Sequence, residues 1–148
     1  MKNIFNYLQL TGTLSSSGMP TPEQLQDVAE AGVQFVVNLA TPRSEGWVPD
    51  EADVFKRLGV DYLSIPVEWE NPTRENLDDF MDAMDAHKNS RALVHCQANY
   101  RATGFIALYR VLRLKWKRED AFVDVHKIWD PQEYPAWNAF IEENLPPK

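Results

Sequence analysis

The stretch LVHCQANYRATG, residues 93–104, decides how this chain is interpreted. It holds the only cysteine of the sequence, Cys96, with His95 directly before it and Arg101 a short distance after it. An apolar run leads into the cysteine, and the residues from Ala102 onward have the apolar spacing of a helix. The pattern predicts a buried strand, a tight loop over residues 96–101, and a helix that begins where the loop ends.

Helices and short apolar runs alternate on the N-terminal side of this stretch. Three segments have the apolar periodicity or the caps of helices: residues 21–31, 50–58 and 73–87. Each precedes a run that predicts a buried strand, at residues 33–40, 60–67 and 91–95. Such alternation indicates parallel strands joined by helical crossovers. We therefore expect an α/β fold with a mainly parallel central sheet of about four to five strands flanked by helices.

The remaining segments complete the predicted architecture. The C-terminal third reads as helix, with segments at 118–129 and 134–144 after the helix that follows Arg101. The serine-rich residues 14–18 read as a turn. At 148 residues the chain is long enough for one domain with a substantial core, so we expect a single domain over 1–148.

Composition limits the classes of function. The formal charge is −7, with 15 lysines and arginines against 22 acidic residues, which argues against a general binder of nucleic acid or of anionic membranes. No apolar run is long enough for a membrane span. A single cysteine cannot form an internal disulfide, so a reducing, cytoplasmic location is expected.

The loop after the third apolar run has the residue types of an oxyanion site. Backbone N–H groups of a tight loop that enters a helix converge on an anion, and an arginine at its end grips two oxygens. Gln97, Ala98, Asn99 and Tyr100 would supply the N–H groups, with Arg101 as the fork. Cys96 would be a nucleophile at the base, with His95 bonded to the loop backbone to orient it. The alternative is that Cys96 is a buried structural thiol.

The same stretch resembles the cysteine-dependent dual-specificity and tyrosine phosphatase superfamily. The resemblance rests on VHC…R after a buried strand, together with GVQFVVNLATPR (32–43) and GVDYLSIPVEWENPT (59–73). It is closest to small bacterial phosphatase-like proteins with a Cys-x4-Arg loop, some of which are fused to metallo-β-lactamase-like domains. It implies that Cys96 takes the phosphoryl group of a phosphorylated protein or small molecule as a cysteinyl-phosphate. It also implies that Arg101 stabilises the transition state, and that no metal or other cofactor is required.

The loop departs from the usual pattern of that superfamily in three ways. Four residues rather than five separate Cys96 from Arg101, a spacing that rhodanese-type sulfurtransferases share, so sulfur transfer through a persulfide on Cys96 is an alternative. The usual loop glycines are absent, and Asn99 is the expected residue to take the left-handed conformation in their place. The hydroxyl residue expected after the arginine is Ala102, which leaves Thr103 as the nearest hydroxyl.

The position of the general acid is the largest departure. The superfamily commonly places an aspartate in a loop before the cysteine, and the segment PVEWENP (66–72) has Trp69 there. Glu68 and Glu70 flank the tryptophan, and because neighbouring side chains of an extended loop point in opposite directions, at most one is expected to face the loop. Glu70 is slightly preferred as the proton donor. If neither serves, a slow phosphatase or a non-catalytic module that binds phosphorylated ligands would result.

Overall fold

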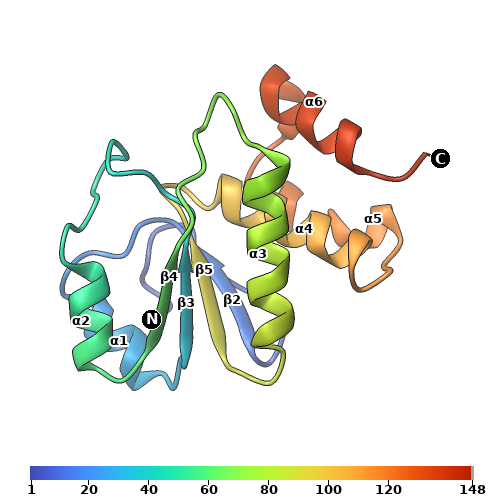
Figure 1. The fold of residues 1–148 in the computed structure, drawn as a ribbon. Helices are drawn as coiled ribbons and strands as arrows, with labels where there is room; N and C mark the ends of the chain where they lie inside the picture. The colour runs from blue at the N-terminus through green and yellow to red at the C-terminus, as the bar shows by residue number, and fades with distance from the viewer. Residues whose placement is uncertain (148) are drawn as a thin grey trace.

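A five-stranded sheet forms the centre of the computed structural model, which describes residues 1–147 (Figure 1). Its strand order is β1-β2-β5-β3-β4, in which β1 is antiparallel to β2 and the other pairs are parallel. The strands are β1 (Leu8–Gln9), β2 (Leu14–Ser17), β3 (Phe35–Asn38), β4 (Asp61–Ser64) and β5 (Ala92–His95). The predicted α/β fold with a mainly parallel sheet is confirmed.

The turn predicted at residues 14–18 is wrong, because Leu14–Ser17 form β2. This strand pairs in parallel with β5, with Ser17 opposite His95. The three serines are buried, and Ser15 Oγ lies 3.4 Å from the carbonyl oxygen of Ala92. Serine has little intrinsic strand preference, so the pairing with β5 outweighs local propensity here.

Two groups of helices cover the two faces of the sheet (Figure 1). On one face lie α1 (Gln24–Glu30) and α2 (Glu51–Arg57). The other face carries α3 (Arg74–Ala86) and α4 (Tyr100–Leu112). The C-terminal third packs beyond α4. It consists of two α-helices, α5 (Arg118–Ala121) and α6 (Pro135–Asn144), and two 3-10 turns between them, η1 (Val125–Lys127) and η2 (Pro131–Glu133). The helical character predicted for this third is confirmed, in shorter elements than expected at 118–129.

Alternation along the central strands divides the core into two parts. In β3, Phe35 and Val37 face α3 and α4, whereas Val36 faces α1 and α2. Leu93 of β5 joins Val36, and the residue after it, Val94, joins the opposite side. Side chains of a strand alternate between faces, so a strand covered on both sides must be apolar throughout. This requirement explains the continuous apolar runs in the sequence.

Caps fix where the helices begin. Thr73 and Asn76 form a reciprocal capping box at the start of α3. Thr21 and Gln24 also exchange two bonds just before α1, with distances of 2.9 and 3.3 Å. Each cap holds backbone N–H groups that a helix start leaves unpaired. Within residues 1–147, no helix has the length and apolar character that a membrane crossing requires.

Candidate active site

Cys96 lies at the carboxyl end of β5, the central strand of the sheet. Only 1% of the residue is exposed, yet it lines a cavity of about 360 Å³. The residues that line this cavity are Trp69, Cys96, Gln97, Ala98, Tyr100, Arg101 and Tyr134. Ligands of parallel sheets bind at the carboxyl ends of the strands, so the position of the cysteine agrees with that rule. We call this cavity the Cys96 pocket.

The loop after Cys96 turns its carbonyl groups away from the pocket. The carbonyl oxygen of Gln97 accepts a bond from the backbone N–H of Met19 at 2.9 Å. That of Ala98 accepts one from the side-chain amide of Asn6 at 3.0 Å. Within residues 1–147, the N–H groups of Gln97, Tyr100 and Arg101 donate no hydrogen bond. Several adjacent unpaired N–H groups at a helix start form an anion site.

Asn99 has the left-handed conformation that its position was predicted to need. Its φ is 71° and its ψ is 6°, directly before α4 begins at Tyr100. The side-chain amide of Asn99 donates to the carbonyl oxygen of Asn6 at 2.8 Å, which holds the loop against the N-terminal segment. Asparagine is among the few non-glycine residues that visit this region readily. The backbone prediction for Asn99 is confirmed.

Gly18 allows β2 and the loop to approach each other closely. It forms an isolated bridge with Ala98, and a Cβ at position 18 would lie 2.7 Å from the carbonyl oxygen of Gln97. It would also lie 2.8 Å from the ring of Phe5. Both distances are shorter than Cβ contacts normally are, so the site requires glycine at this position.

Arg101 points inward, with 6% of the residue exposed. Its Nη1 donates to the carbonyl oxygen of Val67 at 2.8 Å, and its Nη2 lies 3.5 Å from Oγ of Ser44. These contacts hold a cation at the wall of the Cys96 pocket. A fixed guanidinium provides the fork geometry that suits two oxygens of one phosphoryl group.

His95 has a different partner from the predicted one. Its Nε2 lies 2.6 Å from Oε2 of Glu51, at the start of α2, and both side chains are buried. Nδ1 of His95 has no hydrogen-bond partner within residues 1–147, so the predicted bond to the loop backbone is absent from that part of the chain. The imidazole is therefore bonded to Glu51 on the face of the sheet that α1 and α2 cover.

Thr103 supports the loop through backbone contacts. Its hydroxyl donates to the carbonyl oxygen of Asn99 at 2.8 Å and accepts from Nε1 of Trp129 at 2.9 Å. The hydroxyl is therefore held by the first turn of α4 and by the C-terminal region. The Thr103 hydroxyl therefore helps to fix the loop, and none of its bonds is to the Cys96 sulfur.

Trp69 occupies one wall of the Cys96 pocket. Its carbonyl oxygen accepts a bond from Nε1 of Trp137 at 2.6 Å, which fixes this part of the loop against α6. Its ring packs against those of Tyr100, Trp129 and Tyr134, at centroid distances between 5.2 and 5.9 Å. Aromatic rings at such distances and tilts attract one another. The tryptophan at the position of the expected acid is thus part of an aromatic wall.

The two glutamates beside Trp69 lie outside the pocket. Glu68 forms an ion pair with Arg43 on the surface, and Glu70 is exposed. Neither is among the residues that line the Cys96 pocket. The backbone bridge between Glu68 and Asn71 closes a tight turn here, and that turn directs Trp69 inward and its neighbours outward. The structure gives neither carboxylate the place predicted for a proton donor.

Several residues of the site carry no signal in the sequence. Tyr134 lines the pocket from between η2 and α6, although the sequence favours a packing role for it. Glu51 contacts His95, and Gly18 pairs with Ala98, only because the fold brings distant segments together. Glu51 follows an ordinary helix start, and its burial at an N-terminal turn normally exposed to water is the unusual feature.

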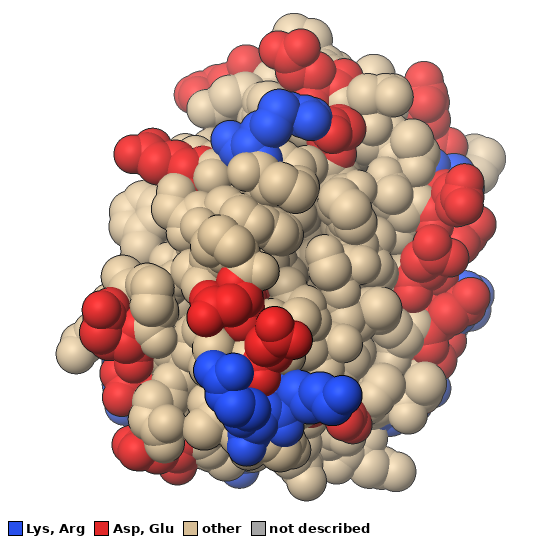
Figure 2. Space-filling model, turned by 60° about the vertical axis from the view of Figure 1, so that its left-hand side comes forward, with Lys and Arg blue, Asp and Glu red and all other residues tan. Residues whose placement is uncertain are grey.

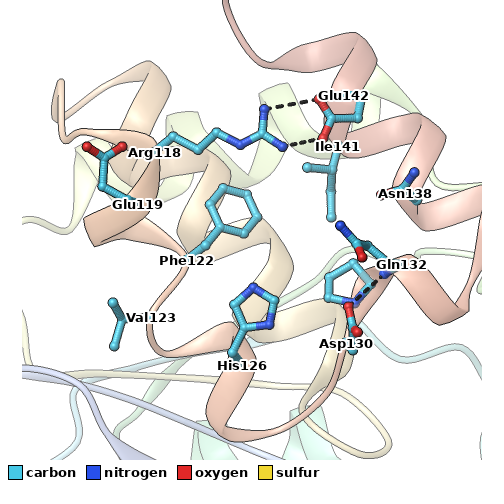
Figure 3. A pocket seen from close by; sticks show the side chains of 11 residues that line it. Arg118, Glu119, Phe122, Val123, His126, Asp130, Gln132, Asn138, Ile141 and Glu142 are labelled. Carbon is cyan, nitrogen blue, oxygen red and sulfur yellow. Dashed lines mark hydrogen bonds and ion pairs between the residues drawn. The ribbon is translucent and has the colours of Figure 1, made fainter. Parts of the chain in front are cut away.

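A larger cavity, of about 680 Å³, lies between α5, η1 and α6 (Figure 3). Phe122 and Ile141 contribute its apolar lining, and His126 points into it from below. Arg118 on its rim is paired with Glu142, so that cation is neutralised. None of residues 95–101 lines this cavity. The larger cavity is therefore separate from the Cys96 pocket.

The surface charge of the protein does not itself attract anions, so an anion must be attracted by the local site. Figure 2 shows a face on which basic side chains lie beside acidic ones, without a broad basic field. The net charge of −7 gives no general attraction for an anion. The inward arginine and the unpaired N–H groups of the loop are thus the local source of positive potential.

Comparison with known proteins agrees with this geometry. A model of the family described as "Swiss Army Knife protein, DSP-PTPase phosphatase domain" matches residues 2–132. The DUF442 protein of Shewanella putrefaciens CN-32 has 36% identity and a TM-score of 0.87, with 97% of this chain and 93% of that chain covered.

Two more distant structures share the fold. The core catalytic domain of the PP-IP phosphatase SIW14 from S. cerevisiae has 19% identity and a TM-score of 0.75, with 94% of this chain and 85% of that chain covered. TpbA from P. aeruginosa, solved in complex with pTyr, has 18% identity and a TM-score of 0.73, with 93% and 83% covered. The chain belongs to the family of DSP-PTPase phosphatase domains.

Proposed function

We propose that the protein hydrolyses phosphate monoesters in two steps, through a cysteinyl-phosphate on Cys96. The observation that carries the proposal is the set of unpaired N–H groups of Gln97, Tyr100 and Arg101 beside a cysteine and an inward arginine. A phosphoryl group is a small anion with three equatorial oxygens, and such donors match it. The substrate is a phosphorylated protein or small molecule whose phosphate reaches the base of the Cys96 pocket.

In the first step, the Cys96 thiolate attacks phosphorus as the bond to the ester oxygen breaks. The loop N–H groups and Arg101 bind the three remaining oxygens, where negative charge is spread in the transition state. The bond from Arg101 to the carbonyl oxygen of Val67 keeps the guanidinium in place before substrate arrives. Donors that are already oriented need no reorganisation during the reaction.

In the second step, water attacks phosphorus, the S–P bond breaks, and inorganic phosphate leaves. The same loop N–H groups and Arg101 stabilise this second transition state. The cysteine returns as thiolate, so the cycle closes without any other reactant. All the groups invoked belong to one loop and to the helix that it enters.

The substitution Cys96→Ser tests the covalent step. We expect it to abolish turnover of 4-nitrophenyl phosphate and to retain binding of inorganic phosphate, because the anion site consists of backbone N–H groups and Arg101. The wild-type protein, quenched during turnover, should carry a phosphoryl group on Cys96 in a mass spectrum. Wild-type rates in Cys96→Ser would disprove the covalent mechanism.

The same protein samples separate the other two chemistries. Sulfur transfer from thiosulfate to cyanide, with a persulfide on Cys96 and no phosphate release, would replace the phosphatase proposal with sulfur transfer. Micromolar binding of a phosphopeptide without phosphate release from any substrate would replace it with a binding module. Each result contradicts the proposal in a different way.

A further inference from the structure

The Cys96 pocket poses the question of which group protonates the leaving oxygen. Among residues 1–147, no aspartate or glutamate is part of its lining. The protons on oxygen in this lining belong to the hydroxyls of Tyr100 and Tyr134. Tyrosine is one of the side chains that act as general acids. The two tyrosines are therefore the candidates.

Tyr134 is held firmly at the wall of the pocket. It lies between Pro131 and Pro135, which begin η2 and α6 and restrict the backbone on both sides. Its ring meets Trp69 nearly edge-on at 5.2 Å and Trp129 at 5.6 Å. Tyr134 is half-buried: its ring packs against these tryptophans, and the residue also lines the Cys96 pocket.

Tyr100 has a different setting. Its ring lies flat on Trp129, with a centroid distance of 5.0 Å and an interplanar angle of 5°. It is also the first residue of α4, so its backbone belongs to the anion loop. Its ring lies 5.9 Å from that of Tyr134, centroid to centroid, in a T-shaped arrangement. The two tyrosines are therefore neighbours in the lining of the same pocket.

The surroundings of Tyr134 keep its hydroxyl protonated. Burial raises its pKa, and the interaction with Tyr100 and the negative charge of Glu133 raise it further. Arg101 is the cation that lines the same pocket. An ordinary tyrosine has a pKa of about 10. A proton is therefore available for donation throughout the neutral range.

We propose that Tyr134 donates the proton to the leaving oxygen, in the role that the sequence assigned to a carboxylate beside Trp69. This inference rests on the proposed phosphatase function. As the Cys96 sulfur bonds to phosphorus and the ester P–O bond breaks, the ester oxygen takes the hydroxyl proton of Tyr134. In the second step, the tyrosinate takes a proton from the water whose oxygen bonds to phosphorus, and the S–P bond breaks. The proton and both bonds are balanced over the cycle.

The dependence on the leaving group tests this role. Phenolate is a poorer leaving group than 4-nitrophenolate, so phenyl phosphate needs the proton and 4-nitrophenyl phosphate largely does not. We expect Tyr134→Phe to lower kcat for phenyl phosphate by about 10²- to 10⁴-fold. The loss for 4-nitrophenyl phosphate should stay below about tenfold. Phenylalanine retains the ring and its packing against Trp69.

Tyr7→Phe is the matched control, because the hydroxyl of Tyr7 bonds to Gln9 and the residue is absent from the pocket lining. It should leave both rates unchanged. A loss of equal size on both substrates in Tyr134→Phe, or no loss on phenyl phosphate, would overturn the proposal. A selective loss on phenyl phosphate in Glu70→Gln would overturn it in favour of the carboxylate.

The pH profile gives a second readout. In the wild-type protein, kcat for phenyl phosphate should not decline between about pH 6 and about pH 9, because a tyrosine stays protonated there. A carboxylic acid donor, with an ordinary pKa of about 4.3, would lose its proton and the rate would fall as pH rises. If the wild-type protein turns over neither substrate, the phosphatase function itself fails. If Cys96→Ser abolishes both rates while Tyr134→Phe changes neither, the inference on Tyr134 alone fails.

Discussion

Nε2 of His95 lies 2.6 Å from Oε2 of Glu51, and these side chains are 0% and 2% exposed. The contact joins the residue before the nucleophile to the first turn of α2, on the opposite side of the sheet from α4. Tyr62 and Asn38 complete the polar group, with Asn38 donating to the Tyr62 hydroxyl at 3.1 Å. A buried polar group of this kind is sensitive to the loss of any member.

Glu51→Ala should therefore destabilise the fold strongly. The substitution leaves the His95 imidazole buried without its hydrogen-bond partner, and an unsatisfied buried polar group costs about 1–3 kcal/mol. Urea unfolding of the variant and the wild type measures the difference. Glu143→Ala removes an exposed glutamate and should change stability by less than about 0.5 kcal/mol. Equal stabilities of the two variants would show that the pair contributes nothing.

The Tyr62 hydroxyl should lose its proton at a higher pH than an ordinary tyrosine, because it belongs to this buried polar group. Burial, and then the charge of Glu51, raise its pKa to about 12. The protonated form is favoured in the folded state, so the associated stability is present below about pH 10 and is lost as pH rises towards about 12. Ultraviolet titration of wild-type protein against Tyr62→Phe isolates this hydroxyl. A midpoint near 10 for Tyr62 would contradict the role given to its surroundings.

Gly18→Ala should disturb the anion loop. The added Cβ would lie 2.7 Å from the carbonyl oxygen of Gln97, so the loop must move or strain accumulates, at a cost of about 1–3 kcal/mol. We expect lower turnover of 4-nitrophenyl phosphate, because the N–H groups of the loop no longer converge.

Gly12→Ala is the control for this substitution, since a Cβ at position 12 meets nothing within 4 Å. Its turnover should match that of the wild type. If Gly18→Ala also kept wild-type turnover, the close approach of β2 to the loop would have no effect on the site.

Local spacing made most of the framework predictable. The apolar runs after Gly32 and after Gly59 imply buried strands, and both glycines have positive φ where the chain leaves a helix. The conformation of Asn99 also follows from local rules, because a loop without glycine must use another residue at positive φ. Neither prediction needs knowledge of distant contacts.

The missed features all depend on contacts between distant parts of the chain. β2 is a strand because β5 pairs with it, and serines alone do not predict that pairing. His95 bonds to Glu51 because the fold brings α2 to the end of β5. Tyr134 reaches the pocket from the C-terminal segment, beyond the residues that the family model matches. The sequence pattern around Cys96 therefore gives no indication of Tyr134.

Arg101→Lys should separate charge from geometry at the pocket. Lysine keeps the positive charge, but its single ammonium cannot bond to the Val67 carbonyl oxygen and also grip two phosphoryl oxygens as a planar fork. The interaction lost is made mainly in the transition state, so kcat for 4-nitrophenyl phosphate should fall by about 10²- to 10³-fold with a smaller change in KM. Arg43→Lys, at an exposed arginine paired with Glu68, should leave both constants unchanged. A rise in KM at unchanged kcat in Arg101→Lys would mean that the arginine binds the ground state and the transition state equally, and would contradict its proposed role.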